Sequence, residues 1–163
     1  EVAMIGGGNS ALQEALLLSE VCKKVTVVQN LADFTGEKKL SEALMQKENV
    51  EAYFSTVVVG YITENGALTG LKLRNEETGK EFEIAVDGAF LAVGLMPEND
   101  AFADFVDLDA AGYIDSAENC QTKTPGIFAA GDCRQKGVRQ VSTATADGAV
   151  AAIAACRYID GLN

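Results

Sequence analysis

The chain has 163 residues, 48% of them hydrophobic, which is enough for a sizeable buried core. The 13 basic and 24 acidic side chains leave a net charge of −11. The electrostatic field of this negative charge repels nucleic-acid backbones and anionic membranes, so we expect neither as a partner. No apolar run approaches the ~20 residues that cross a bilayer, and no basic segment followed by an apolar one opens the sequence, which predicts a cytoplasmic protein.

The sequence contains no histidine, which excludes a His-dependent catalytic triad. Its cysteines are too widely spaced to form a C-x-x-C pair, so neither a zinc site nor a dense disulfide framework is indicated. We expect them to be small buried side chains without a catalytic role. They are Cys22, Cys120, Cys133 and Cys156.

The first elements predict a βαβ unit. The chain lacks an initiator methionine and enters at once an apolar run over 2–5, which is typical of a strand buried on both faces; we therefore expect a piece of a longer protein. A glycine-rich turn over 6–10 leads into a helix over 11–19. A β-branched run over 25–28 follows, and parallel strands need such a helical crossover. A second helix is predicted over 38–46.

An antiparallel meander is predicted next. Extended segments cover 50–54 and 56–63, where the apolar period changes to two residues. Asn65-Gly66 then joins two alternating segments, the second over 68–74, and this dipeptide is a strong hairpin signal. A further turn leads to a strand over 81–86 with one solvent-facing side.

The last part of the chain predicts a return to parallel sheet. An apolar segment over 89–93 predicts a buried strand, and the break that follows it places a domain boundary after residue 93. We expect a short edge strand over 112–115, a buried strand over 127–130 and a closing helix over 142–159. That helix has a face of small residues, which allows close approach to a sheet or a ligand: Ala144, Gly148, Ala151, Ala152 and Ala155.

The turn after the first strand carries the most informative pattern, Gly6-x-Gly8-x-x-Ala11. Gly6 supplies the backbone freedom of a tight turn, Gly8 lets a pyrophosphate approach the main chain, and Ala11 permits close helix packing. The helix start at Asn9 and Ser10 presents unpaired N–H groups to phosphate charge. Within a βαβ unit this spacing predicts dinucleotide binding, although such a turn can also be purely steric.

The end of the second strand bears on which dinucleotide binds. An acid there hydrogen-bonds a ribose 2′-OH, whereas arginines neutralise a 2′-phosphate. The residues at this place are Gln29, Asn30 and Leu31, and none is charged. We therefore expect NADH to bind at least as well as NADPH. The alternative is a half-site that has lost nucleotide binding and binds neither coenzyme.

A third pattern lies at the end of the segment 122–132. The predicted strand delivers Asp132 to its carboxyl end, where ligands bind in open α/β sheets. Gly131 allows close contact, and the Asp132 carboxylate can accept hydrogen bonds from ligand hydroxyls. Taken alone, this pattern can be simply the end of a strand followed by an acid in a turn.

Together these stretches resemble the low-molecular-weight thioredoxin reductase family of flavoprotein disulfide reductases. The resemblance runs from residue 2 to about 162 and is strongest over 2–19, in A-V-G-L-M-P over 92–97 and in T-P-G-I-F-A-A-G-D over 124–132. It implies that residues 1–93 form a pyridine-nucleotide-binding domain and that residues 94–163 form the C-terminal half of an FAD-binding domain.

The resemblance also implies site residues. Asp132 would contact the ribityl and phosphate region of FAD. The segment before the last helix would lie beside the isoalloxazine ring, where the positive helix end favours electron density on the reduced flavin. Its residues are Arg139, Gln140 and Val141.

The sequence departs from the family in two ways. The family's H-R-R-x-x-F-R stretch, which grips the 2′-phosphate, reads Q-N-L-A-D-F-T over 29–35, so the Phe remains and the basic residues are absent. Some similar proteins take electrons from ferredoxin instead of a nicotinamide nucleotide. The redox-active C-x-x-C pair and the N-terminal flavin fingerprint of the family are also absent.

These observations predict an α/β fold and a function. The fold would be a Rossmann-like parallel sheet with an antiparallel meander, followed by part of an FAD domain. The resemblance implies that the parent protein moves electrons from a reduced donor through FAD to a thioredoxin-like protein disulfide, as a homodimer. We expect that the 163 residues alone do not turn over. A related flavoprotein such as a small-molecule dithiol oxidase, a ferredoxin-dependent member and a non-enzymatic nucleotide-binding module stay open.

Overall fold

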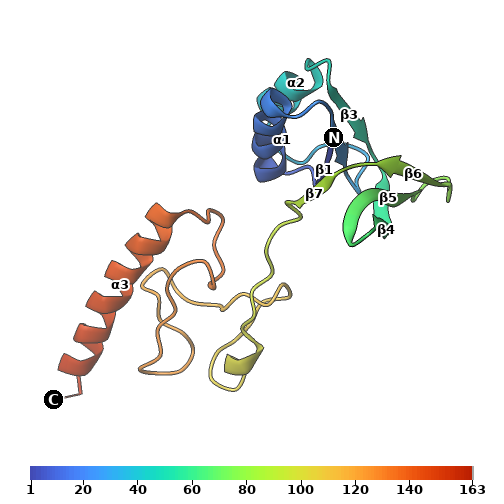
Figure 1. Cartoon of the computed structure of the whole chain (residues 1–163). Coiled ribbons are helices and arrows are strands. Elements are labelled where there is room, and N and C mark those ends of the chain that lie inside the picture. Colours follow the sequence, from blue (N-terminus) through green and yellow to red (C-terminus); the bar gives the residue numbers. More distant parts are fainter. Residues whose placement is uncertain (163) are drawn as a thin grey trace. The chain divides into compact units, whose positions relative to one another are not determined.

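The computed structural model describes residues 1–162 and divides the chain into two compact units. The first unit is Glu1–Gly94, and the second begins at Leu95 (Figure 1). None of the helices within residues 1–162 has both the length and the apolar character needed to span a bilayer. Each unit has its own core, so each is described by itself.

The first unit is built on a four-stranded parallel sheet. Its strands are β1 (Val2–Ile5), β2 (Val25–Val28), β3 (Val50–Tyr53) and β7 (Gly88–Leu91), in the order β3-β2-β1-β7. The predicted βαβ unit is confirmed, because β1 and β2 pair in parallel and α1 (Asn9–Val21) connects them.

Helices α1 and α2 (Lys38–Met45) cover one face of this sheet, and α2 packs against α1. The buried face of α1 repeats Leu12 and Ala15 at helical spacing, and these side chains meet Val25 and Val27 of β2. Full burial of a leucine or valine side chain of this kind contributes roughly 1.5–3 kcal/mol. The hydrophobic period read from the sequence therefore specifies this layer.

A three-stranded antiparallel meander covers the other face. It consists of β4 (Thr56–Glu64), β5 (Ala67–Asn75) and β6 (Glu81–Ala85), in that order. The predicted hairpin is confirmed: Asn65 and Gly66 have φ of 51° and 81°, as a type I′ turn requires. Buried Leu71 and Leu73 of β5 pack against the parallel sheet.

Strand β7 differs from its prediction. It joins the parallel sheet beside β1, as expected, but it ends at Leu91 and forms the edge, so it is not buried. Phe90 and Leu91 are 42% and 65% exposed. An edge strand has a neighbour on one side only, and apolar composition alone does not reveal that position.

The second unit holds one long helix and very little sheet. Apart from α3 (Val141–Asp160) and a short 3₁₀ turn, η1 (Asp100–Phe102), its described residues form loops joined by isolated bridges. The predicted strands over 112–115 and 127–130 are wrong. Ile114 takes part in two isolated bridges and Phe128 in one, because no neighbouring segment in the described chain continues a ladder beside them.

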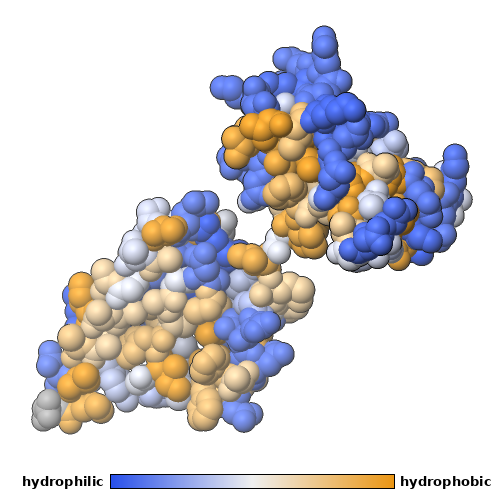
Figure 2. Space-filling model, in the orientation of Figure 1, coloured by the Kyte–Doolittle hydropathy of each residue, from blue (hydrophilic) through white to orange (hydrophobic). Residues whose placement is uncertain are grey.

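Helix α3 is confirmed, but much of it faces solvent. Figure 2 shows apolar colouring along much of the visible face of α3. Val141 is 82% exposed and Ile153 is 55% exposed, and Ala154 is the only residue of the helix that is buried. Of the predicted small-residue face, Gly148 and Ala152 are exposed, and the remaining three alanines are half-buried.

Candidate functional site

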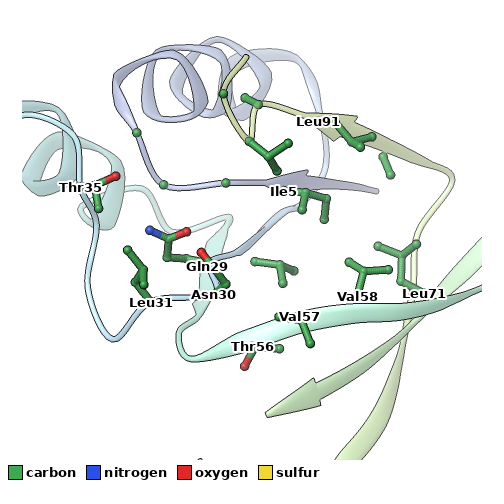
Figure 3. Close-up of a pocket in the computed structure, with 18 of the residues that line it drawn as sticks. Ile5, Gln29, Asn30, Leu31, Thr35, Thr56, Val57, Val58, Leu71 and Leu91 are labelled. Atoms are coloured by element: carbon green, nitrogen blue, oxygen red, sulfur yellow. The ribbon is translucent and has the colours of Figure 1, made fainter. Parts of the chain in front are cut away.

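A cavity of about 570 Å³ lies in the first unit, where the carboxyl ends of the parallel strands meet the meander (Figure 3). Its walls come from residues 5–8 and 28–31, from β4 and β5 of the meander, and from the end of β7. Among the described residues, none that line it is charged. Figure 3 shows the polar side chains of Gln29 and Thr35 toward one end and apolar Leu71 toward the other.

Gly6 and Gly7 are glycines because of contacts inside the chain. Gly6 has φ of +128°, and a Cβ there would lie 2.9 Å from the carbonyl carbon of Ala92 and closer still to its oxygen. A Cβ on Gly7 would lie 2.5 Å from Nε2 of Gln29. Both positions bring the turn against neighbouring segments, and both line the cavity.

Gly8 has a different reason to be glycine. Its φ of −82° suits any residue, and a Cβ there would meet only Oγ1 of Thr35, at 3.8 Å. No packing inside the chain therefore requires a glycine at this cavity-lining position. Helix α1 starts here with no side-chain cap and no acid in its first turn, which leaves first-turn N–H groups open to an anion.

The other three residues of the predicted motif have separate roles. Ala11 is buried, and a Cβ on Gly6 would lie 3.5 Å from its own Cβ, which agrees with close helix packing. Ser10 is exposed on α1 and does not line the cavity. The Asn9 side chain bonds Glu37 instead of pointing into the cavity, with the Glu37 N–H donating to Oδ1 at 2.6 Å.

The structure separates Gln29 from Asn30. Gln29 is 4% exposed, and its Nε2 donates to the carbonyl of Asp33 at 3.2 Å. Asn30 is exposed at the cavity, and its side chain has no hydrogen-bond partner within residues 1–162. Of the two amides predicted at the end of β2, only that of Asn30 is exposed and without a hydrogen-bond partner in the described residues.

Several cavity residues were not predicted. The sequence indicates that a meander follows β3, but nothing in its pattern shows that Val57, Val58 and Tyr61 would form a wall of this cavity. Thr35 lies in the stretch that resembles the family's basic segment, and that position is the signal by which it could have been found.

This arrangement fits a dinucleotide. A turn whose main chain is open at Gly8 can take a pyrophosphate, apolar walls can take planar rings, and an amide and a hydroxyl at Asn30 and Thr35 can bond ribose. The same lining offers no cation, so a 2′-phosphate placed there has no charge partner among the lining residues.

The second unit holds the other predicted residues. Gly131 has φ of +89° and precedes Asp132, which is exposed and has no side-chain partner within the described residues. Arg139 is half-buried, with its guanidinium 3.7 Å from the ring centre of Tyr113. Its Nε donates to the main-chain oxygen of Asp132 at 3.4 Å.

Gln140 and Val141 lie at the start of α3. The Gln140 side chain accepts the N–H of Thr143, and Thr143 Oγ1 accepts the N–H of Gln140 at 3.1 Å, which forms a capping box. Val141 is exposed. The cap therefore bonds the N–H groups of Gln140 and Thr143 at the helix end that was expected to lie beside a flavin.

Beneath Gly131 lies an ionic cluster that sequence reasoning missed. The Asp147 carboxylate accepts the Gly131 N–H at 3.1 Å, Arg134 Nη1 at 3.1 Å and Lys136 Nζ at 2.7 Å. The hydrogen bond from Lys136, the amide of Gly131 and the charge of Arg134 together hold the pKa of Asp147 below its usual value despite its burial. The signal was an acid within the Ala-rich part of the helix, away from the helix ends.

The cysteines are free, but the expectation that all four are buried is wrong. Cys120 is buried, and this burial raises the pKa of its thiol. Cys22 and Cys133 are half-buried, and Cys156 is exposed on the solvent side of α3. A helix that packs through only one face leaves its other positions in solvent, whatever their polarity.

Comparison with known proteins gives consistent matches. Residues 1–148 match the family described as pyridine nucleotide-disulphide oxidoreductase. Thioredoxin reductase of Peptoclostridium litorale is 37% identical over 168 residues, covering 99% of this chain and 53% of that protein. Thioredoxin reductase of Bacillus subtilis is 34% identical, covering 100% of this chain and 52% of that protein.

The fold matches as well. The crystal structure of Lactococcus lactis thioredoxin reductase superposes with a TM-score of 0.88 at 32% identity, over 98% of this chain and 53% of that one. The chain thus spans about half the length of the relatives it matches.

Proposed function

The chain belongs to the pyridine nucleotide-disulphide oxidoreductase family, and on that basis we propose that it is part of a flavin-dependent, thioredoxin reductase-like oxidoreductase. The whole protein would carry electrons from a reduced donor through FAD to a protein disulfide of the thioredoxin type. The observation that carries the proposal is Gly8, a glycine that no contact inside the chain requires, at an uncapped helix start beside an uncharged cavity.

The first unit is proposed to be the nicotinamide-nucleotide-binding domain. The turn over 6–8 would hold the pyrophosphate, and Asn30 would hold the adenosine ribose. The apolar wall formed by Val58 and Leu71 would exclude water from the planar rings. These assignments rest on the position of the cavity at the carboxyl ends of the parallel strands.

The second unit is proposed to be part of the flavin-binding domain. The carboxylate of Asp132 is exposed and has no partner within residues 1–162, so it suits hydrogen bonds from ribityl hydroxyls. Gly131 would allow close approach, and the segment 139–141 would lie beside the ring. When bound, a nicotinamide coenzyme supplies a hydride and a flavin relays its two electrons to a disulfide, while the protein provides binding and orientation.

The cavity lining predicts the coenzyme. Because none of the described residues that line the cavity is a cation, we expect calorimetry to show NADH binding at least as tightly as NADPH. Asn30→Arg places a guanidinium at the cavity, and we expect it to raise the affinity for NADPH relative to the affinity for NADH by about tenfold, the effect of ~1.4 kcal/mol.

A matched control is Thr63→Arg, which adds the same charge at an exposed position of β4 that does not line the cavity. It should leave the ratio of the two affinities unchanged. A wild-type chain that clearly prefers NADPH would contradict this assignment of the coenzyme.

A second candidate is a flavoprotein reduced by ferredoxin, or a relative that oxidises small dithiols. The missing cations at the cavity favour the ferredoxin donor. If neither nicotinamide nucleotide binds but the longer protein reduces a disulfide with reduced ferredoxin, this candidate replaces the first. A homodimeric parent and a cytoplasmic location belong to the same proposal, and sizing the longer protein and locating it in cells would test them.

A further inference from the structure

The loop between β2 and α2, residues 29–37, forms one end of the cavity. Four of its residues line that end: Gln29, Asn30, Leu31 and Thr35. The loop contains no regular helix or strand. Its position therefore depends on the contacts that hold it.

The C-terminal end of the loop, residues 35–37, is held by the glycine turn and the first residue of α1. The N–H groups of Thr35 and Gly36 both donate to the carbonyl of Gly7, at 2.9 and 3.0 Å. The N–H of Glu37 donates to Oδ1 of Asn9 at 2.6 Å, and Nδ2 of Asn9 donates to Oε1 of Glu37 at 3.4 Å. Asn9 therefore binds the loop through Glu37, which is the last loop residue before α2.

The absence of a side chain at residue 36 permits this approach. A Cβ on Gly36 would lie 2.5 Å from Cδ1 of Leu12 and 2.9 Å from both the main-chain nitrogen and Oδ1 of Asn9. Real Cβ atoms do not come so close, so a substitution would move the loop away from α1. Gly36 and Asn9 thus act at the same contact.

We propose that Asn9 is a positioning residue that holds the 29–37 loop against the glycine turn and so places Asn30 and Thr35 where they meet the adenosine half of a dinucleotide. This rests on the proposed nucleotide-binding function. Both polar atoms of the Asn9 side chain are bonded to Glu37. Asn9 would thus act on the ligand through the loop, whereas the sequence suggested that it binds the ligand itself.

The first test needs no nucleotide. Hydrogen exchange of the 163-residue chain, followed by mass spectrometry, reports the protection of peptides covering residues 30–38. We expect Asn9→Ala to speed exchange there by about tenfold while peptides from β5 stay protected. Glu37→Ala is the matched control, because it keeps the short bond from its own N–H to Asn9 and removes only the 3.4 Å bond. Equal protection in Asn9→Ala and wild type overturns the proposal.

The second test measures affinity for ADP-ribose, which carries the adenosine half and the pyrophosphate without nicotinamide. Calorimetry should show binding about fivefold to tenfold weaker for Asn9→Ala and nearly unchanged for Glu37→Ala. Since Gly36→Ala displaces the same loop, the losses in Asn9→Ala and Gly36→Ala should be far from additive in the double variant. Additive losses would mean that Asn9 contacts the ligand directly, which overturns a positioning role.

The two tests also separate this inference from the function on which it rests. If the wild-type chain binds no nucleotide, the proposed function fails and the effect on ligand affinity is overturned with it. The exchange measurement would still report whether Asn9 holds the loop.

Discussion

Two glycines in one turn differ in whether packing inside the chain requires a glycine at their position. Gly6 combines a positive φ with main chain from the end of β7 lying against it, whereas Gly8 has an ordinary φ and open space. The spacing Gly6-x-Gly8 predicts that Gly6 serves the turn and that Gly8 serves a bound pyrophosphate. The surroundings of each Cα agree with that difference, because contacts inside the chain require a glycine at Gly6 and not at Gly8.

We expect substitutions at these two positions to separate stability from binding. Gly6→Ala should lower the free energy of unfolding by about 3 kcal/mol, because the new Cβ would overlap main chain at an unfavourable φ. Gly8→Ala should cost less than about 1 kcal/mol, because it changes only a helix N-cap. Urea unfolding of the two variants checks the contrast.

At Gly8, in contrast, we expect a large effect on NADH affinity and a small one on stability. Although it is nearly as stable as wild type, Gly8→Ala should lose most of its NADH affinity in calorimetry, because the added methyl group stands between the pyrophosphate and the main chain. A Gly8→Ala chain that binds NADH as wild type does would show that the open main chain there has no role.

At the residue scale, the sequence predicted which positions form the turn and that the end of β2 is uncharged. It did not predict that Gln29 folds under Gly7 while Asn30 stays free, because that choice depends on the Asp33 carbonyl and on the turn packed above. Side-chain direction at the end of a strand is decided by neighbours that the local pattern does not contain.

Between elements, the Asp147 cluster ties α3 to the segment that carries Gly131. Arg134 and Lys136 have side chains only 10% and 11% exposed, and Asp147 lies between them at 15%. Arg134 also donates through Nη2 to the carbonyl of Ala117 at 2.9 Å. The pair of Asp147 and Arg134 thus links α3, the 131–136 segment and Ala117 in a unit that has almost no sheet to order it.

Removing this carboxylate should destabilise the second unit in a pH-dependent way. Asp147→Asn leaves two mostly buried cations without a counter-ion, and we expect a loss of about 3 kcal/mol in the free energy of unfolding at pH 7. The folded-state pKa of Asp147 is lowered from an ordinary value of 3.8, first by the hydrogen bond from Lys136. The stabilisation is therefore complete above pH 3.8 and declines as the pH falls through the folded-state pKa.

Urea unfolding at several pH values checks this prediction for α3. The gap between wild type and Asp147→Asn should be constant from pH 7 to pH 5 and should shrink below pH 3.8. Asp160→Asn, at the exposed C-terminal end of the same helix, serves as the control and should be nearly neutral. A gap that persists unchanged at pH 2 would show that the ion pairs do not account for it.

The predicted strands that failed also belong to this scale. The segments 112–115 and 127–130 have strand-like composition, yet each has only isolated bridges within the described chain. A helix satisfies its hydrogen bonds within itself, whereas a strand needs a partner. The prediction of α3 was therefore confirmed, and these strand predictions were not.

For the whole molecule, two units with separate cores predict two unfolding transitions. The first unit has two apolar clusters on either side of its parallel sheet, and the second has a single small one around Val106, Ile114 and Ala129. We expect hydrogen exchange across a urea series to show peptides from 1–94 losing protection at a higher urea concentration than peptides beyond residue 94.

NADH should shift only the first unit's transition. At one hundred times its Kd, a ligand that binds only the folded state adds about 2.7 kcal/mol to stability. The transition of peptides beyond residue 94 should stay in place. A common shift of all peptides would mean that the chain unfolds as one cooperative body.

The sequence by itself determined the features that are local along the chain: the βαβ unit, the hairpin at Asn65-Gly66, helix α3 and the glycine turn whose spacing led to the family. Periodicity and turn chemistry act between residues a few positions apart, so a linear pattern contains them. The tertiary structure alone decided that β7 is an edge, that the meander walls the cavity, that Asn9 holds a loop and that Asp147 gathers two cations. These features depend on contacts between residues distant in sequence, where burial and hydrogen-bond partners are set by three-dimensional packing.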